Sequence, residues 1–269
     1  MSHPPLKRRT RPTALSDILD GVKLYKVWTY LSYQDLISRY RRSIIGPFWI
    51  AAVMATQAVA LSLVFGAIYH LGVKDFLPYV ISGLTVINLI ACGFNEGADT
   101  FNIYSPFIRA HSLPISFHVF RMVCRHFVVF MHNFIVYCVV SMIYTQTIPI
   151  TIMLIPGLIL AIVFMTSTIF ITSSLSLRFI DFKFILPHIF TIVFYFTPVI
   201  WKPSMISSHM SLVYTLNPLY YLLEVVRSPL LGKDVPLNVW EGAIGVTLAT
   251  AIIGYMVFAN MRKKIPLWL

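Results

Sequence analysis

The side chains that could carry covalent chemistry are few, and their spacing forms no catalytic constellation. His70 and Asp75 have the His-x4-Asp spacing of glycerolipid acyltransferases, where the histidine acts as a general base and the aspartate orients it. In this sequence the pair flanks a short turn between two apolar runs, and no neighbouring residues suit an acyl donor. The pair is therefore assigned no catalytic role.

Motifs for nucleotide and metal chemistry are missing from the sequence. A phosphate-binding loop needs Gly-x4-Gly-Lys-Ser/Thr, and the only Gly-Lys pair, Gly232-Lys233, has no such context. No Asp-x-Asp pair points to a metal-dependent glycosyltransferase, and Cys92, Cys124 and Cys138 lack metal-ligand spacing. We expect no enzyme, and no cofactor or metal bound by this chain. An enzyme acting on lipid-linked sugars is the alternative, but it would need acidic or nucleophilic residues clustered at one membrane interface.

The composition indicates a chain that lies largely in lipid. Of its 269 residues, 58% are hydrophobic and 12% charged, and the mean hydropathy is +0.78. Soluble domains are usually about half apolar and about one quarter charged, so a bilayer must be the solvent for much of this chain. The net charge of +11 does not indicate a nucleic-acid partner, because the basic residues lie at the ends of apolar runs rather than along one aromatic-rich face.

Long uncharged stretches predict membrane-spanning helices, which need about 20 largely apolar residues each. The sequence predicts an all-α membrane protein with six transmembrane helices within 44–261, an N-terminal amphipathic interfacial helix, and short re-entrant outer helices before the last span. The spans are expected at about 47–70, 76–96, 122–144, 150–177, 184–201 and 239–261. A basic tail, 1–13, precedes this domain, and a short tail, 262–269, follows it.

The distribution of Lys and Arg orients these spans. With the N-terminus on the cytoplasmic side, most of the 21 Lys and Arg residues fall in cytoplasmic segments. The basic residues placed on the outer side are Lys74, Lys202, Arg227 and Lys233. This asymmetry agrees with the positive-inside rule, so both termini are expected to be cytoplasmic.

Three segments outside the spans have features that a simple connection does not need. Residues 14–43 combine apolar residues at helical spacing with aromatic rings, which predicts a helix lying in the cytoplasmic interface. The 99–121 loop places apolar residues among polar ones, which favours docking to a soluble partner over a plain chain reversal. The 202–237 segment is expected outside, where Glu224 and Arg227 form either an exposed ion pair or a partly buried one.

Polar and aromatic side chains within the spans have two interpretations each. We expect the polar ones to make packing hydrogen bonds between helices, since acidic groups are too few for a proton relay. They include Gln57, Asn88, Asn95, Glu96, His132, Asn133 and His188. Aromatic rings most often face lipid or packed neighbours, but a conduit for sugar polymers would use flat rings as weak, repeated contacts. The candidates for such a channel lining are Phe48, Trp49, Phe194, Tyr195 and Trp201.

Three stretches of this sequence resemble one known family. Arg39–Trp49 (RYRRSIIGPFW) closely resembles the beginning of the first span in ABC-2 type permeases. Leu113–Arg121, followed by Arg125, resembles the region before the third span of O-antigen and related polysaccharide exporters. Asn217–Arg227 is similar to the outer segment of the same group. The stretches occur in the expected order across nearly the whole chain, so they are specific together.

The resemblance implies a homodimer of six-helix subunits around a central conduit in the bacterial inner membrane. Two copies of a separate ATPase, which binds ATP and Mg²⁺, would dock on the cytoplasmic side. The cargo would be an undecaprenyl-diphosphate-linked O-antigen polysaccharide, with capsule, teichoic acid or a drug as alternatives. The interfacial helix would act as a cytoplasmic gate, and the 203–231 segment, with Glu224 and Arg227, would form an outer gate.

The resemblance also implies roles for two further groups of residues. Residues 104–117 would form a coupling helix, and its contacts with the ATPase are expected from Phe107, Ile108, Arg109, Leu113 and Pro114. The arginines before the first span could attract the lipid diphosphate, although orienting charges explain them equally well. These are Arg39, Arg41 and Arg42.

Overall fold

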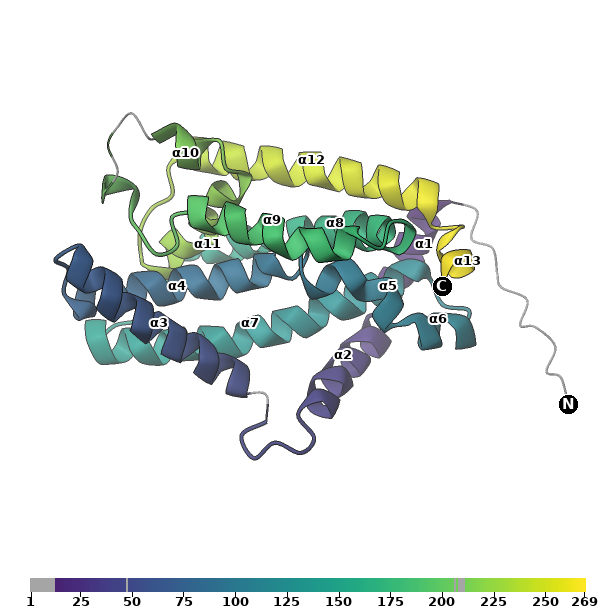
Figure 1. Ribbon diagram of the computed structural model, residues 1–269, viewed down its shortest axis with the longest axis horizontal. Helices are drawn as coiled ribbons and strands as arrows, with labels where there is room; N and C mark the ends of the chain where they lie inside the picture. Colours follow the sequence, from purple (N-terminus) through teal and green to yellow (C-terminus); the bar gives the residue numbers. More distant parts are fainter. Residues whose placement is uncertain (1–12, 47, 206, 208–210) are drawn as a thin grey trace, which may run out of the picture.

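The computed structural model describes residues 13–46, 48–205, 207 and 211–269, and its regular elements there are all helices (Figure 1). Helices are the expected result, because a bilayer leaves backbone groups no partner outside their own segment. In chain order they are α1 (Ala14–Lys23), α2 (Tyr25–Arg39), α3 (Phe48–Ile68), α4 (Val73–Ala91), η1 (Glu96–Asp99), α5 (Thr100–Ile103), α6 (Ser105–Ala110), α7 (Ile115–Thr145), α8 (Leu154–Arg178), α9 (Phe182–Phe196), η2 (Pro203–Met205), α10 (Ser211–Thr215), α11 (Pro218–Leu230), α12 (Leu237–Met261) and α13 (Ile265–Trp268). The predicted basic tail lies outside the described residues, apart from Thr13.

Five helical segments of the described chain are long and apolar enough to cross a membrane. They are α3, the run from Val73 to Ala110 that begins with α4, α7, α8 and α12. The remaining predicted span, the fifth at about 184–201, corresponds to α9, whose 15 residues extend about 22 Å against a hydrocarbon core of about 30 Å. The helix was expected to reach residue 201 but ends at Phe196, because Thr197 precedes a proline and is extended. The count of six therefore stays a prediction.

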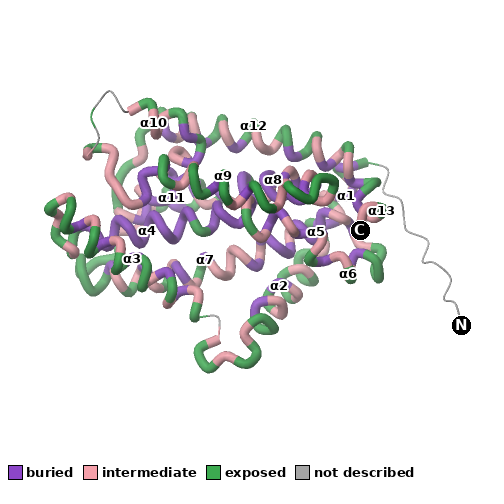
Figure 2. Tube along the Cα trace, viewed as in Figure 1, coloured by how far each residue is buried: buried purple, intermediate pink, exposed green. Residues whose placement is uncertain are grey.

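Helix α4 forms the centre of the bundle. From Phe76 to Ala91 every residue is buried except Asn88, and Figure 2 shows this continuous buried trace. Helices α3, α7, α8 and α11 all pack against α4. A helix that is largely apolar on all sides is expected inside a bundle rather than at its lipid-facing surface.

Small residues bring α8, α11 and α12 close together, as is common between helices in membranes. A Cβ added at Gly157 of α8 would lie 2.1 Å from the carbonyl oxygen of Val225 in α11. A Cβ at Gly254 of α12 would lie 2.8 Å from the carbonyl oxygen of Ser167 in α8. The outer segment 202–237 thus includes a helix, α11, that packs directly on the spanning helices, and whether it re-enters the membrane stays a prediction.

The segment expected to be one interfacial helix is two helices, α1 and α2, separated at Leu24. Asp17 of α1 is buried, and its Oδ1 and Oδ2 accept hydrogen bonds from the backbone N–H groups of Ser116 (3.0 Å) and Ile115 (3.3 Å). This carboxylate therefore caps the N-terminus of α7, where the chain leaves Pro114 in an extended conformation.

Because of this cap, α7 begins earlier than the sequence predicts. Residues 115–121 were expected to belong to the 99–121 loop but form the first turns of α7. The helix has 31 residues, or about 46 Å, which exceeds the hydrocarbon core by several turns. Its length therefore leaves room for the first turns, which carry Arg121 and Arg125, to lie outside the hydrocarbon core.

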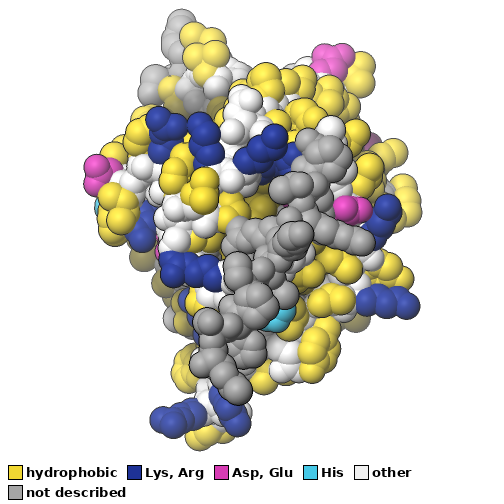
Figure 3. Space-filling view, turned by 90° about the vertical axis from the view of Figure 1, so that its right-hand side faces the viewer, with side chains coloured by type: hydrophobic (Ala, Val, Ile, Leu, Met, Phe, Trp, Pro, Cys, Tyr) yellow, Lys and Arg dark blue, Asp and Glu magenta, His cyan; other side chains and the backbone are white. Residues whose placement is uncertain are grey.

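We call the end of the molecule with α1, α2, α6, α13 and the first turns of α7 the basic end; it lies to the right in Figure 1. Figure 3 views this end face on and shows Lys and Arg side chains spread over it among hydrophobic ones. The opposite end carries α10 and the turn between α3 and α4.

Candidate functional site

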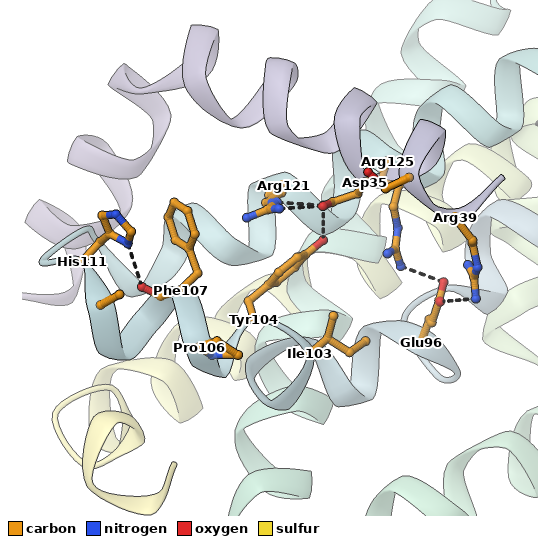
Figure 4. A pocket seen from close by; sticks show the side chains of 12 residues that line it. Asp35, Arg39, Glu96, Ile103, Tyr104, Pro106, Phe107, His111, Arg121 and Arg125 are labelled. Carbon is orange, nitrogen blue, oxygen red and sulfur yellow. Dashed lines mark hydrogen bonds and ion pairs between the residues drawn. The ribbon is translucent and has the colours of Figure 1, made fainter. Parts of the chain in front are cut away.

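At the basic end, Asp35 binds α2 to the first turns of α7. The Arg121 guanidinium donates to Asp35 through Nε (2.7 Å to Oδ2) and Nη2 (2.6 Å to Oδ1), as Figure 4 shows. This two-pronged geometry is the strongest that an Arg–carboxylate pair adopts. The hydroxyl of Tyr104, which precedes α6, donates to the same carboxylate at 3.0 Å. One acidic side chain of α2 therefore contacts both α7 and the segment leading into α6.

Glu96 of η1 forms a second junction beside the first. Its Oε2 lies 2.7 Å from Arg125 Nη2 and 3.0 Å from His126 Nε2, both on α7. Its Oε1 lies 2.9 Å from Nη2 of Arg39, the last residue of α2. The Arg125 side chain is 9% exposed and that of Arg39 is 54% exposed, so the contact with α7 is buried and the contact with α2 faces water.

Aromatic rings attach α6 to the same unit. The Arg121 guanidinium lies 4.4 Å from the centre of the Tyr104 ring and 5.3 Å from that of Phe107. Phe107 in turn stacks on His111 at 4.3 Å between ring centres, and the His111 ring lies 3.3 Å from the Phe107 carbonyl oxygen. Such cation–π contacts stabilise a desolvated guanidinium by about 2 kcal/mol. These contacts connect α6 to both α2 and α7.

A cleft of about 740 Å³ opens between α2 and α6 (Figure 4). Pro106, Phe107 and His111 line it on the α6 side, and the ion pairs of Asp35 and Glu96 line it on the other. Among the described residues, no group of three or more His, Cys, Asp or Glu side chains could hold a metal ion. The Asp and Arg side chains and the Glu side chain that line the cleft are already paired with one another.

The predicted coupling residues differ in exposure. Arg109 is exposed, while Phe107 and Leu113 are half-buried. Ile108 was expected to contact the ATPase, but it is 2% exposed and belongs to the hydrophobic core. Pro114 is also buried, next to the start of α7. Ile108 faces inward because a short helix lying on the bundle must bury one side, which leaves Arg109 on the other.

The three predicted diphosphate-binding arginines are not brought together as a site. Arg39 is paired with Glu96, whereas Arg41 and Arg42 are exposed in the connection between α2 and α3. The role of these residues toward a lipid diphosphate stays a prediction.

The predicted channel aromatics fall into two groups with different neighbours. Phe48 and Trp49 are half-exposed at the start of α3, where Phe48 meets the His132 ring edge-on at 5.3 Å. Tyr195 is 63% exposed near the end of α9, and its carbonyl accepts a hydrogen bond from the Trp201 indole at 3.3 Å. The fifth ring, Phe194, is half-buried and packs against Tyr195. Whether the rings face a conduit stays a prediction.

The predicted outer pair is buried rather than exposed. Arg227 of α11 is 1% exposed and forms an ion pair with Glu224, which is 14% exposed. The same guanidinium donates to the Pro198 carbonyl and lies 4.3 Å from the centre of the Tyr79 ring in α4. Burial disfavours the charged form of Arg227, but the Glu224 carboxylate offsets this and raises the pKa of the guanidinium. Of the two interpretations of this pair, the structure supports the partly buried one.

Sequence reasoning missed the partners at the basic end. Asp35, Tyr104 and the roles of Arg121 and Arg125 as ion-pair partners were not predicted, because these contacts join residues far apart in the chain. The small number of acidic residues could have indicated these partners. The chain has 10 Asp and Glu residues, so an acidic residue expected on the same side of the membrane as several arginines is a candidate ion-pair partner.

Comparison with known proteins identifies the family of this chain. Residues 26–231 match the ABC-2 type transporter family. The matched region includes both junctions at the basic end and the Glu224–Arg227 pair. No match was found among curated proteins. The matched region covers well over half of the chain and contains four of the five candidate spans. The chain therefore belongs to the ABC-2 type transporter family, and it is a multi-pass membrane permease subunit that pairs with an ATPase subunit.

Proposed function

We propose that this permease exports an undecaprenyl-diphosphate-linked polysaccharide, such as O-antigen, across the bacterial inner membrane. It would act as a homodimer, with two copies of a separate ATPase bound at its basic end. An isologous dimer is the commonest closed assembly, and it would give each ATPase an equivalent docking surface.

The observation that carries the proposal is the attachment of α6 to α2 and α7. An ATPase that moves α6 would act on Phe107 and Tyr104, which contact Arg121. Arg121 holds Asp35, so the movement reaches α2, the predicted cytoplasmic gate. The exposed side of this segment offers Pro106, Arg109 and His111 to a soluble partner.

The charge distribution supports a cytoplasmic basic end. Lys and Arg residues gather at this end, in α2, α7 and the segment after α12. The spanning helices leave few basic residues at the opposite end, and one of these, Arg227, is buried and paired. By the positive-inside rule, α6 would then lie on the cytoplasmic side, where an ATPase could reach it.

The choice of polysaccharide as cargo is supported by the sequence stretches of the first subsection. Leu113–Arg121 with Arg125 resembles polysaccharide exporters in particular. In the structure these residues form the end of the α6 connection and the first turns of α7, which carry the ion pairs.

Copurification with the ATPase tests the docking surface. We expect the partner ATPase to copurify with this chain from membranes, and Arg109→Glu to remove most of the bound ATPase. Lys74→Glu reverses a charge at the opposite end and serves as the control. Equal ATPase recovery with both variants would show that α6 is not the docking surface.

Transport by proteoliposomes of the complex tests the cargo. We expect lipid-linked polysaccharide to cross the membrane only when the ATPase and ATP are present. Movement of a teichoic acid or a drug, but not of the polysaccharide, would replace the proposed cargo. Covalent change of the glycan without the ATPase would overturn the transport proposal.

A further inference from the structure

A second hollow, of about 590 Å³, lies between α3, α4 and α7 and is lined by polar side chains within the membrane-spanning region. We call it the amide groove, after the four amide side chains that line it: Gln57 of α3, Asn88 of α4, Asn133 of α7, and Asn95, which directly precedes η1. Amides from three spanning helices thus converge on one space, although polar residues in the spans were mostly expected to make packing hydrogen bonds between helices.

The amides in the groove are available to a ligand. Asn133 is 1% exposed, and neither its Oδ1 nor its Nδ2 has a hydrogen-bond partner among the described residues. Asn88 is the exposed residue of the otherwise buried stretch Phe76–Ala91. Gln57 is exposed on the facing side of the groove. The packing role predicted for Asn133 is therefore wrong, because its amide bonds to no other helix.

These amides exclude lipid chains as the occupant of the groove. An amide without a hydrogen-bond partner costs about 2–7 kcal/mol on transfer from water to an apolar medium. Polar residues on spanning helices therefore face a water-filled cavity or a polar ligand. Alkyl chains offer neither donor nor acceptor to Asn88 and Asn133.

The charges around the groove select a neutral ligand. Glu96 is the carboxylate that lines it, and this group is bonded to Arg39, Arg125 and His126. The Glu96 carboxylate is therefore not free to bind a cation, and the Arg39 guanidinium is not free to bind an anion. What remains are amides, each of which both donates and accepts, beside the half-exposed ring of Trp49.

We infer that the amide groove binds neutral, hydroxyl-rich sugar units. Hydroxyl groups both donate and accept, so they match side-chain amides, and an aromatic ring offers a flat surface to the apolar face of a sugar. This inference rests on the proposed polysaccharide function and names the chemistry that the groove recognises.

The groove also meets the junction that holds α2. Arg39 and Glu96 line both the amide groove and the cleft beside α6. Along α7, Asn133 lies eight residues beyond Arg125, or about 12 Å. A sugar chain in the groove would thus reach from the ion pairs into the membrane.

Cysteine accessibility tests the groove in membranes that contain the complete complex. In a background without native cysteines, Asn88→Cys and Gln57→Cys are treated with a charged, water-soluble methanethiosulfonate. Ile155→Cys on α8 is the control, because Ile155 is 55% exposed on an apolar surface away from the groove. The probe ligand is maltoheptaose, a neutral linear glucose oligomer.

We expect both groove cysteines to react and the control to react far more slowly. Maltoheptaose at ten times its dissociation constant should slow the groove reactions about tenfold, by competitive occupancy. Reaction without any protection would show a groove that holds water alone, and absence of reaction at both positions would show that lipid or a second copy covers it; either result overturns the inference. Because the assay needs neither ATP nor ATPase binding, it can fail while copurification and export still support the proposed function.

Discussion

Replacing Arg121 with alanine is expected to release α2 from α7. The guanidinium holds Asp35 at 2.7 and 2.6 Å, with 9% of the Arg121 side chain and 21% of the Asp35 side chain exposed. Removing one partner of a buried ion pair costs about 3–5 kcal/mol, whereas an exposed pair contributes about 0–1 kcal/mol. Because water reaches part of Asp35, we expect an intermediate cost of about 2 kcal/mol.

Labelling of Cys124 measures this release. Its Sγ lies 3.0 Å from the Ser32 hydroxyl of α2, so opening of α2 exposes the thiol. In a variant with Cys124 as the sole cysteine, a maleimide should react in proportion to the population of the open state. A cost of about 2 kcal/mol enlarges that population about 30-fold, and because Cys124 is already partly exposed, Arg121→Ala should raise the labelling rate by up to this factor.

Two comparisons make the result decisive. Lys23→Ala removes an exposed ion pair with Asp20 on α1, 77% and 43% exposed, and should leave the labelling rate nearly unchanged. Adding Asp35→Asn to Arg121→Ala should give little further increase, because the carboxylate has already lost its partner. An unchanged rate in Arg121→Ala would refute the reasoning, since other contacts would then hold α2.

Three further substitutions test contacts elsewhere in the fold. Arg227→Lys is expected to lower the thermal unfolding temperature in detergent almost as much as Arg227→Ala. The reason is that an ammonium cannot reproduce the guanidinium geometry that joins Glu224 and a backbone carbonyl. An unfolding temperature equal to that of the unsubstituted protein would contradict this. Gly157→Ala places a methyl group 2.1 Å from a carbonyl oxygen of α11 and should reduce the yield of monodisperse protein in size-exclusion chromatography, whereas Gly245→Ala, with nothing within 4 Å, should not. Asp17→Ala removes the cap of α7 at a cost of about 1 kcal/mol, measured as faster hydrogen exchange in its first turn; unaltered exchange there would exclude the capping role.

The helical architecture can be predicted from the sequence because it depends on local patterns. Long uncharged runs predict α3, α7, α8 and α12, because backbone N–H and C=O groups in hydrocarbon must form their hydrogen bonds within the same segment. The spacing of Glu224 and Arg227 predicts their pairing, because residues three apart lie on one face of a helix. Their burial depends on Tyr79 and Pro198, which come from other elements, so it does not follow from spacing.

The candidate site could be predicted less well, because long-range partners leave no periodic signal. Arg121 and Arg125 look like orienting charges at a membrane boundary, and their spacing says nothing of Asp35 or Glu96. The early start of α7 depends on a carboxylate of α1, which no local pattern of the 99–121 loop contains. The amide groove is hidden for the same reason, since Gln57, Asn88 and Asn133 converge only once three helices have packed.

The cap that Asp17 places on α7 has a consequence for membrane insertion. Asp17 and Ser116 are 99 residues apart, so a growing chain releases α1 from the ribosome long before the group that it must cap. Until then this carboxylate stays hydrated at the membrane surface, while α3 and α4 enter the bilayer. Burial of Asp17 therefore has to wait until the start of α7 has been synthesised, so the N-terminal helices can close onto the bundle only after α3 and α4.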